Sequence, residues 1–270
     1  MITASLVVYN CEINKLCETI DTFLSQDVDK YLVIVDNAST KREIINVLHE
    51  KYSDCKGIAI INGLLNRGYG GGNNIGFIVA REYLRLNNLV GSYHVILNPD
   101  LVITEGCLRK MSLFLDDRKE IGLLVPKVCN MDGTVQELNK ENPTVFDLFA
   151  RRFLPSFLTK RDFFIKRTEY YTRKAFGYDK IVEVPFVSGC FMMFRYDIYL
   201  KLSGFDESFF LYMEDADISL RANKISKVVF YPDAVVKHHW GRDSHKSYRM
   251  MFIAIKSAVI YFWKHGLKIY

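Results

Sequence analysis

Tyr31-Leu32-Val33-Ile34-Val35-Asp36-Asn37 is the stretch that decides the fold class of this chain of 270 residues. Its apolar residues run without alternation and stop at a polar pair, which is typical of a strand buried on both faces of a parallel sheet. Similar runs recur in the first half of the chain at 5–9, 58–61 and 94–97. Apolar residues at helical spacing separate them, at 16–24, 44–52 and 75–86. This alternation predicts an α/β fold with a mainly parallel central sheet and helices on both faces.

Local signals predict further elements. Thr40 and Glu43 have the spacing of a capping box at the start of a helix, and Asp132-Gly133 is a hairpin signal. The basic, aromatic stretch 144–178 is expected to form a mobile insertion or an interfacial helix. In the last third of the chain we expect strands at 189–194 and 227–231, a short helix at 215–225 and a C-terminal amphipathic helix at 245–265.

The composition is that of an ordinary soluble globular protein, with 49% hydrophobic and 25% charged residues. The chain begins with a strand-like run, Ile2 to Val8, so we expect no signal peptide. Its six cysteines form no CxxC pair and no zinc spacing. Without an export signal, they are expected to be reduced core residues of a cytoplasmic protein.

The net charge of +5 is unevenly distributed. Residues 151–174 hold eight Lys/Arg against two Asp/Glu, and residues 237–270 hold seven against one, so each segment carries +6 and the remainder carries −7. Both segments are also rich in aromatic residues, a mixture that suits an anionic membrane surface or a lipid-linked acidic substrate. Nucleic acid is the competing partner for these basic segments, but the sequence contains no recognition motif that supports it. The longest apolar run, Met250 to Trp263, is broken by Lys256 and too short to span a bilayer.

Polar residues follow three of the expected strands, at Tyr9-Asn10, Asp36-Asn37 and Asn98-Pro99-Asp100. Ligands of open parallel sheets bind beyond the carboxyl ends of the strands, so these residues predict one binding site. Asp36 is placed to accept N–H bonds from a base or to bind a ribose hydroxyl; its alternative role is a turn or cap. Asp100 is placed to bind a divalent metal ion together with diphosphate oxygens, and its alternative is a plain turn.

A glycine-rich stretch runs from Asn66 through Gly72 to Gly76. Glycines allow close backbone approach to a ligand, and the N-terminus of a following helix favours an anion. The stretch differs from the dinucleotide fingerprint GxGxxG, because Asn73 stands where the third glycine belongs and the stretch follows the third strand. The sequence therefore argues against a nicotinamide-dependent dehydrogenase.

Three carboxylates crowd into Glu214-Asp215-Ala216-Asp217, directly after an apolar, aromatic run. Such crowding beside apolar walls raises the pKa of a carboxyl group toward use as a general base. The alternative is an acidic first turn of a solvated helix, in which Asp217 pairs with Arg221 at i, i+4. His238, after the last strand, is placed to complete a metal site; its alternative is a structural hydrogen bond.

Taken together, six motifs occur in an order that resembles family 2 inverting glycosyltransferases, specifically the bacterial rhamnosyltransferase-like branch. They are 35–39, 66–76, 97–100, 204–210, 214–217 and 238–242. The resemblance implies a GT-A (Rossmann-like nucleotide-diphospho-sugar transferase) fold, a nucleotide-sugar donor, and Mg²⁺ or Mn²⁺. Asn98 replaces the first Asp of the family's Asp-x-Asp, a usual change in this branch.

The resemblance also implies roles for single residues. Asp215 is the expected general base, and the expected acceptor-binding residues are Glu214, Asp206 and Glu207. Asp100 and His238 are the expected metal ligands. The expected donor-binding residues are Tyr9, Asn10, Asp36, Asn37, Asn66, Arg67, Gly72, Asn73, Asn98, Asp100 and Arg242.

The implied substrates are dTDP-L-rhamnose and a polyprenyl-diphosphate-linked saccharide, in assembly of an O-antigen or capsule. Galactofuranosyl- and other hexosyltransferases share these motifs and remain alternatives. A sugar-nucleotide-binding protein without catalysis is another, but mere binding needs no base such as Asp215.

We expect a GT-A domain at 1–244, with a nucleotide-sugar-binding half at 1–125 and an acceptor half with the catalytic base at 126–244, followed by the helical segment 245–270. The enzyme is expected to lie peripherally on the cytoplasmic face of the plasma membrane. Tyr261, Phe262 and Trp263 are the expected interfacial anchors. In the alternative, Met250 to Trp263 packs against the sheet.

Overall fold

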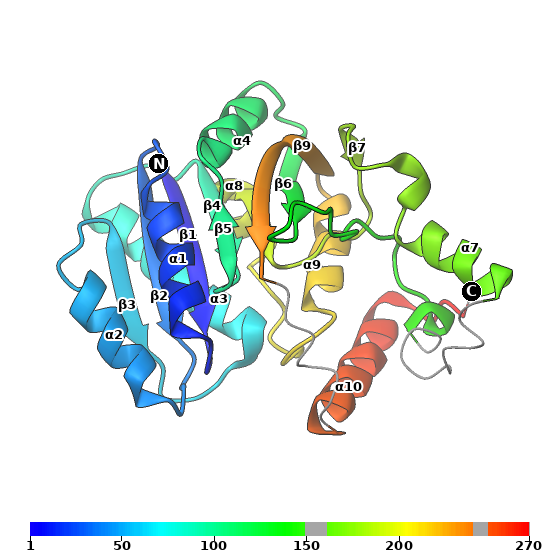
Figure 1. Ribbon diagram of the computed structural model, residues 1–270, viewed down its shortest axis with the longest axis horizontal. Coiled ribbons are helices and arrows are strands. Elements are labelled where there is room, and N and C mark those ends of the chain that lie inside the picture. Colours follow the sequence, from blue (N-terminus) through cyan, green and yellow to red (C-terminus); the bar gives the residue numbers. More distant parts are fainter. Residues whose placement is uncertain (149–160, 240–247, 270) are drawn as a thin grey trace.

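The computed structural model describes residues 1–148, 161–239 and 248–269 (Figure 1). Within these ranges, nine strands form one mixed sheet in the order β3-β2-β1-β4-β8-β6-β9-β5, and β7 pairs with β9. The strands are β1 (Ile2–Val8), β2 (Lys30–Asp36), β3 (Ile58–Asn62), β4 (Tyr93–Leu97), β5 (Leu101–Ile103), β6 (Ile121–Cys129), β7 (Val182–Glu183), β8 (Phe191–Arg195) and β9 (Lys227–His238).

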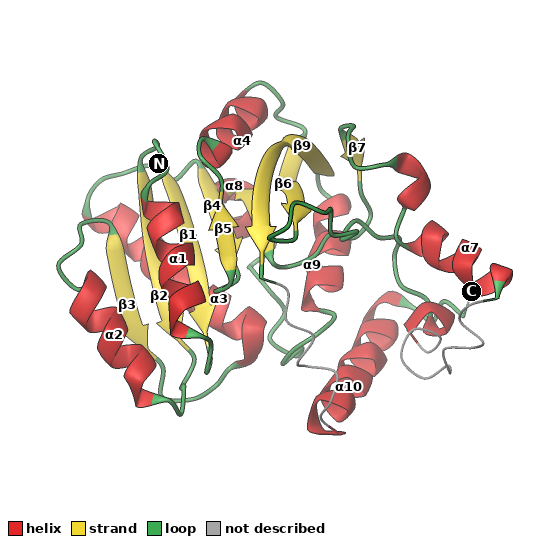
Figure 2. Cartoon of the chain, viewed as in Figure 1, coloured by secondary structure: helices red, strands yellow, loops and turns green. Residues whose placement is uncertain are grey.

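The first four strands are parallel, as the alternation predicts, and β6 and β9 run in the same direction. Strands β8, β5 and β7 run against them. Every residue of β1 is buried, as is every residue of β2 after Lys30. Apolar residues on both faces of a strand require cover on both sides, and helices supply it (Figure 2). The mainly parallel central sheet with helices on both faces, expected from the sequence, is therefore confirmed.

The helices α1 (Ile13–Leu24), α2 (Arg42–Tyr52) and α4 (Cys107–Asp116) pack on one face, where Leu16, Ile44 and Met111 join the same core as β1 and β2. The other face is covered by α3 (Gly68–Leu86), α8 (Tyr196–Lys201) and α9 (Glu214–Asn223). Further described helices include α7 (Asp162–Tyr171), the 3₁₀ turn η1 (Lys174–Phe176) and α10 (Tyr248–His265).

The glycine-rich stretch is part of a helix, where the sequence predicted a loop. Helix α3 begins at Gly68, seven residues before the expected Ile75. A Cβ at Gly72 would lie 2.8 Å from both Cγ atoms of Val7, and one at Gly76 would lie 2.5 Å from Cβ of Ser5. These glycines therefore allow the helix to approach β1, rather than a ligand to approach the backbone.

The predicted capping box is wrong. Helix α2 begins at Arg42, and no side chain of its own caps it. Instead, Oδ1 of Asn10 accepts hydrogen bonds from the backbone N–H groups of Thr40 and Lys41, at 2.9 and 3.2 Å. A side chain from the residue pair after β1 thus holds the two residues that lead into the helix.

The hairpin signal at Asp132-Gly133 marks a tight turn after β6. Gly133 has φ +88°, and Cys129 forms an antiparallel bridge with Val135. The boundary expected between residues 125 and 126 lies inside β6, which pairs with β8 and β9. The two proposed halves therefore share one sheet.

Helix α10 packs on α9 and on the segment that precedes it. Tyr261 is buried with Phe209, Met213 and Ala216, and Oγ of Ser257 donates to the carbonyl of Leu211 at 2.8 Å. Tyr261 therefore faces the protein, which contradicts its expected role as a membrane anchor. The alternative of packing against the sheet is also wrong, because these partners lie outside the strands. Among the described residues, no helix is long and apolar enough to cross a membrane.

Candidate active site

The expected strand-end residues gather at the carboxyl edge of the sheet. In Figure 1 the arrows of β1, β2 and β9 point toward the lower edge, the side on which α10 also lies. Burial raises the pKa of the Cys11 thiol to about 12, with smaller contributions from the charges of Asp100 and Asp36. Burial also raises the pKa of Cys190 to about 12, with smaller contributions from Asp100 and Asp215. The charges of three carboxylates from distant parts of the sequence therefore act on these two thiols.

Asp215 lies in the first turn of α9, after a turn in an uncommon conformation. Tyr212 and Met213 have φ of +69° and +68°, a region that side chains other than glycine rarely adopt, so this turn is strained. The backbone N–H of Ala216 donates to Oδ1 of Asp215 at 2.9 Å, and that of Gly189 donates to Oδ2 at 3.4 Å. These bonds direct the carboxylate toward the residue before Cys190.

The neighbouring carboxyl groups titrate differently. Burial raises the pKa of Asp215, while the charge of Lys140 and backbone hydrogen bonds lower it. Burial raises the pKa of Glu214 well above its usual value, and the charge of Asp215 raises it further. Oε2 of Glu214 is buried without a hydrogen-bond partner. The rise is larger for Glu214, so Asp215 is the carboxyl group of the two that ionises first.

The third carboxylate of the motif is structural. Oδ2 of Asp217 lies 2.7 Å from Nη2 of Arg221, as the i, i+4 spacing predicts. Its Oδ1 lies 2.8 Å from Nε2 of His265 in the last turn of α10. The guanidinium of Arg221 also donates to the carbonyls of Leu202 and Gly204. Asp217 therefore connects α9, α10 and the loop after α8.

The two expected metal ligands lie together. His238 is the last residue of β9, where the sequence placed it after the strand, and it pairs with Leu101 of β5. Its Nε2 lies 3.2 Å from Oδ1 of Asp100. The contact lacks hydrogen-bond geometry, since the same Oδ1 is buried without a hydrogen-bond partner. An unsatisfied carboxylate oxygen beside an imidazole nitrogen suits a divalent cation.

These two residues do not enclose a cation by themselves. Across the described ranges, no group of three or more His, Cys, Asp or Glu side chains could hold a metal ion. Oxygens of a bound diphosphate would have to complete the coordination, as Mg²⁺ sites in phosphate-binding proteins allow. The next residue, His239, is not part of the pair, because its ring contacts Glu18 at 2.8 Å.

Several expected donor-binding residues are engaged within the protein. Asn37 donates to Asn66 Oδ1 and to the carbonyl of Gly68, and accepts from the N–H of Arg67. Asn73 is fully buried, accepts from Ser5 Oγ and donates to a backbone carbonyl. These amides hold the start of α3 in place, so their contribution to donor binding would be indirect.

The strand-end carboxylate Asp36 is also buried and accepts from the backbone N–H of Ser39. Tyr9 is 47% exposed beside it, and the amide N–H of Asn98 donates to the carbonyl of Cys190. These positions border the cluster of carboxylates. Arg242 lies outside the described residues.

The expected acceptor residues make internal contacts. Burial opposes ionisation of Asp206, but hydrogen bonds from Lys264 and Ser208 dominate and lower its pKa to about 2. Glu207 lies 3.7 Å from Arg67 in an exposed ion pair. Asp206 therefore attaches α10 to the loop that precedes α9.

Sequence reasoning missed two residues of the site. Lys140 carries its charge close to Asp215, because its segment pairs with Phe186. Gln136 contacts the ring of His238, with Oε1 3.0 Å from Nδ1. Alternation after the hairpin turn places Thr134 and Gln136 on one side of the chain, a signal that was available. No local signal points to Lys140, since its partners are distant in sequence.

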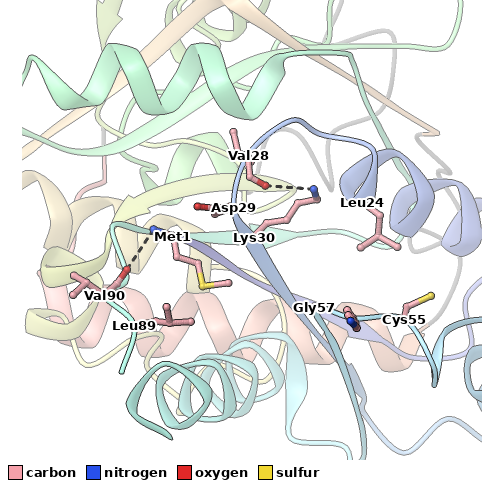
Figure 3. Close-up of a pocket in the computed structure, with 10 residues that line it drawn as sticks. Met1, Leu24, Val28, Asp29, Lys30, Cys55, Gly57, Leu89 and Val90 are labelled. Atoms are coloured by element: carbon pink, nitrogen blue, oxygen red, sulfur yellow. Dashed lines mark hydrogen bonds between the residues drawn. The ribbon is translucent and has the colours of Figure 1, made fainter. Parts of the chain in front are cut away.

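A cavity of about 730 Å³ lies at the opposite edge of the sheet. Met1, Val28, Lys30, Gly57 and Val90 line it, at the amino ends of the strands (Figure 3). It contains none of the carboxylates described above. The cavity lies at the amino edge of the sheet and is therefore separate from the candidate active site at the carboxyl edge.

Comparisons with known proteins agree with this arrangement. The chain is 24% identical to the rhamnosyltransferase WbbL of Escherichia coli K12 over 239 residues, which cover 87% of this chain and 81% of that protein. It is 25% identical to the N-acetylglucosaminyl-diphospho-decaprenol L-rhamnosyltransferase of Mycobacterium tuberculosis over 187 residues, 64% of this chain and 59% of that protein.

The fold is similar to that of GalNAc-T7, solved with UDP, GalNAc and Mn²⁺, with a TM-score of 0.66 and 14% identity over 88% of this chain and 43% of that chain. The sequence profile of Glycosyl transferase family 2 matches residues 4–202. Since this match covers most of the chain, the protein belongs to glycosyl transferase family 2 and is a glycosyltransferase with a GT-A fold.

Proposed function

We propose that the protein is an inverting glycosyltransferase that moves L-rhamnose from dTDP-L-rhamnose to a polyprenyl-diphosphate-linked saccharide of a surface polysaccharide. The observation that carries the proposal is the segment 189–190: the N–H of Gly189 donates to Oδ2 of Asp215, and the carbonyl of Cys190 accepts from the N–H of Asn98, two residues before Asp100. A candidate base and a candidate diphosphate site thus lie along one short segment. The similarity to two rhamnosyltransferases supports rhamnose, and the name of the mycobacterial one supports a lipid-linked acceptor.

In the proposed reaction, Asp215 accepts the proton of an acceptor hydroxyl. The hydroxyl oxygen attacks the anomeric carbon from the side opposite the nucleotide, and the bond from that carbon to the diphosphate oxygen breaks. The electron pair leaves with dTDP, and the configuration at the anomeric carbon inverts. Glu214, as the neutral acid, would donate a hydrogen bond to the acceptor.

Asp100 and His238 would hold a divalent cation, which would neutralise the charge that develops on the diphosphate. The buried, unpartnered Oδ1 of Asp100 supports this assignment. Asp36 would bind the base or ribose of the donor, with Tyr9, Asn98 and Arg67 bordering the same site. Asn10, Asn37, Asn66, Gly72 and Asn73 would act indirectly, by holding the backbone of that site.

We further propose that α10 rests on an anionic membrane surface. Its outward face carries Tyr248, Phe252, Val259 and Trp263, which are between 63% and 83% exposed, with Ile255 beside them at 41%. Their spacing forms one stripe along the helix. Arg249 and Lys256, both exposed, lie on the same helix. Apolar residues flanked by basic ones are typical of an interfacial helix, which supports a peripheral location on the cytoplasmic face.

A donor panel tests the proposed function. The purified protein would be given dTDP-L-rhamnose, UDP-galactofuranose, UDP-glucose and UDP-N-acetylglucosamine with a polyprenyl-diphosphate N-acetylglucosamine acceptor. We expect dTDP release and a product of inverted anomeric configuration by NMR. If the protein prefers another donor, the transferred sugar is that one and not rhamnose, and the protein is one of the alternative hexosyltransferases. Donor binding without turnover, over a range of acceptors, would favour a non-catalytic sugar-nucleotide-binding protein.

A further inference from the structure

A chain of hydrogen bonds connects the turn after β6 to the imidazole of His238. It starts at Asp132, whose Oδ1 accepts from the hydroxyl of Thr134 at 2.6 Å. Oγ1 of Thr134 then accepts from the amide of Asn130 at 2.8 Å. Oδ1 of Asn130 accepts from Nε2 of Gln136, also at 2.8 Å. Oε1 of Gln136 lies 3.0 Å from Nδ1 of His238.

The chemistry of the end groups fixes the direction of this chain. An ionised carboxylate only accepts, so the Thr134 hydroxyl must donate to Asp132 and its oxygen is left to accept from Asn130. The oxygen of Asn130 therefore faces Gln136 and accepts a hydrogen bond from its amide N–H. Gln136 is in turn left with its oxygen toward the imidazole of His238.

A second contact fixes the same amide independently. Nε2 of Gln136 also donates to the backbone carbonyl of His238 at 3.2 Å. A flipped amide would place two oxygens against each other here, because a carbonyl cannot donate. Gln136 is 5% exposed, so water offers it little compensation. Both contacts therefore require Oε1 to face Nδ1.

The consequence concerns the other ring nitrogen. Because Oε1 of Gln136 only accepts, Nδ1 of His238 must carry the proton. In the neutral ring, Nε2 then presents its lone pair, and it does so 3.2 Å from the unpartnered Oδ1 of Asp100. Two acceptors face each other at this distance, an arrangement that a shared cation stabilises.

We propose that Asp132, Thr134, Asn130 and Gln136 form a positioning relay that keeps the proton of His238 on Nδ1 and presents Nε2 to the metal ion. The inference deepens the proposed function, since it rests on a cation at Asp100 and His238. The turn is thereby assigned a purpose beyond reversing the chain. Gln136 acts through His238 and does not itself touch the substrate.

The tautomer is measured directly by ¹H–¹⁵N correlation spectroscopy of the histidine rings in the metal-free, full-length protein. Comparison with His238→Asn assigns the signals of His238. We expect the Nδ1–H form in the wild-type protein. An Nε2–H form would overturn the inference, and this measurement needs no variant that alters the relay.

Metal affinity gives the second readout. Binding of Mn²⁺ in the presence of dTDP, followed by electron paramagnetic resonance, should weaken about 10- to 100-fold in Gln136→Met, the usual effect of removing a partner of a metal ligand. Gln136→Glu retains an acceptor for Nδ1 and should keep the Nδ1–H signal, but its second oxygen faces the carbonyl of His238 and Oδ1 of Asn130, so it should recover only part of the affinity. Met131→Leu, in the same turn but outside the relay, is the matched control and should bind as the wild type does.

The possible failures are distinguishable. Unchanged Mn²⁺ affinity and tautomer in a folded Gln136→Met variant would overturn the relay. Sugar transfer by a wild-type protein that binds no Mn²⁺ would also overturn it, while leaving the proposed transfer in place. A wild-type protein that binds Mn²⁺ in the Nδ1–H form but transfers no sugar would instead overturn the proposed function.

Discussion

At the scale of single residues, the candidate site contains two buried carboxyl groups, of which Glu214 has the more strongly raised pKa. A carboxyl group whose pKa is raised on folding binds its proton more tightly in the folded state. The stability of the protein must then fall as pH rises from the ordinary Glu pKa of about 4.3 toward the raised value. Glu214→Gln removes this penalty, so the variant should unfold at a higher temperature than the wild type at pH 8.

The advantage of Glu214→Gln should shrink as pH falls toward 4, which thermal unfolding over a pH series would reveal. The advantage at pH 8 follows the size of the rise in the pKa of Glu214, at about 1.4 kcal/mol for each pH unit. Asp206→Asn is a control of opposite sign. Hydrogen bonds lower the pKa of Asp206 to about 2. Its contribution to the stability of the folded protein is therefore present above the ordinary Asp pKa and is lost as pH falls through about 2. A pH-independent gain for Glu214→Gln would contradict the protonation assignment.

The metal ligands belong to the same scale. Asp100→Ala should abolish transfer and weaken donor binding, because the diphosphate loses the cation that balances its charge. His238→Ala should be milder, since the carboxylate remains. EDTA should inhibit the wild-type enzyme, and Mg²⁺ or Mn²⁺ should restore it. If EDTA has no effect while Asp100→Ala is inactive, Asp100 acts through hydrogen bonds to the donor instead.

At the scale of elements, the contact of α3 with β1 depends on glycine. Gly72→Ala places a methyl group 2.8 Å from both Cγ atoms of Val7, closer than van der Waals contact permits. We expect destabilisation of about 1–3 kcal/mol, the usual cost of overpacking, measured by urea unfolding. Ile78→Ala, on the exposed side of α3, is the control and should change stability by less than about 0.5 kcal/mol. A Gly72→Ala variant of normal stability but weak donor binding would instead favour direct approach of the ligand.

The same elements explain what could be predicted from the sequence. Strands buried on both faces, such as β1 and β2, were predicted because an uninterrupted apolar run is a local signal. Strand β6 was missed, and β9 was expected to end at Tyr231 rather than at His238. Pro126 and Pro232 interrupt the apolar runs of β6 and β9, so each run reads as ending there. In the structure Pro126 pairs with Tyr231 and the next residue, Lys127, pairs with Val235. This register shift takes up the extra residues of β9, and the pairing of the two strands continues beyond it. Such a bulge depends on two strands that are distant in sequence.

The residues of the candidate site divide in the same way, into those that a local sequence signal predicts and those that depend on contacts distant in sequence. Clustering at strand ends was predictable for Asp36 and Asp100, because all parallel strands bring their carboxyl ends to one edge. The internal role of Asn73 in α3 was not, since its partner Ser5 comes from β1, which is distant in sequence. A local motif thus predicts which residues gather, and tertiary hydrogen bonds decide which of them remain available to a ligand.

At the scale of the whole molecule, α10 has two different faces. Ser257, Tyr261 and His265 contact the segment around Asp215, while Phe252 and Trp263 point away from the protein. Phe252→Ser with Trp263→Ser should reduce binding to anionic vesicles about tenfold or more, since each buried aromatic side chain is worth about 1.5–3 kcal/mol. Sedimentation with phosphatidylglycerol vesicles at low and high salt would measure this.

The vesicle experiment has internal controls. Leu64→Ser removes an equally exposed apolar residue far from α10 in sequence and should not change binding. High salt should weaken binding of the wild type, because each Lys or Arg near the surface contributes about 1 kcal/mol of electrostatic attraction. Equal absence of the wild type from anionic and neutral vesicles would contradict membrane docking.

The account as a whole depends on Asp215 as the base of a single displacement. Asp215→Asn keeps the size of the side chain and an oxygen that can accept from Gly189 or Ala216, but removes the proton acceptor. The most direct test is the rate of sugar transfer by Asp215→Asn under single-turnover conditions, with donor affinity measured in parallel. We predict a loss of about 100-fold or more, the usual scale for a positioned general base, with donor affinity nearly unchanged. Transfer at close to the wild-type rate would contradict the assignment of Asp215 as the base.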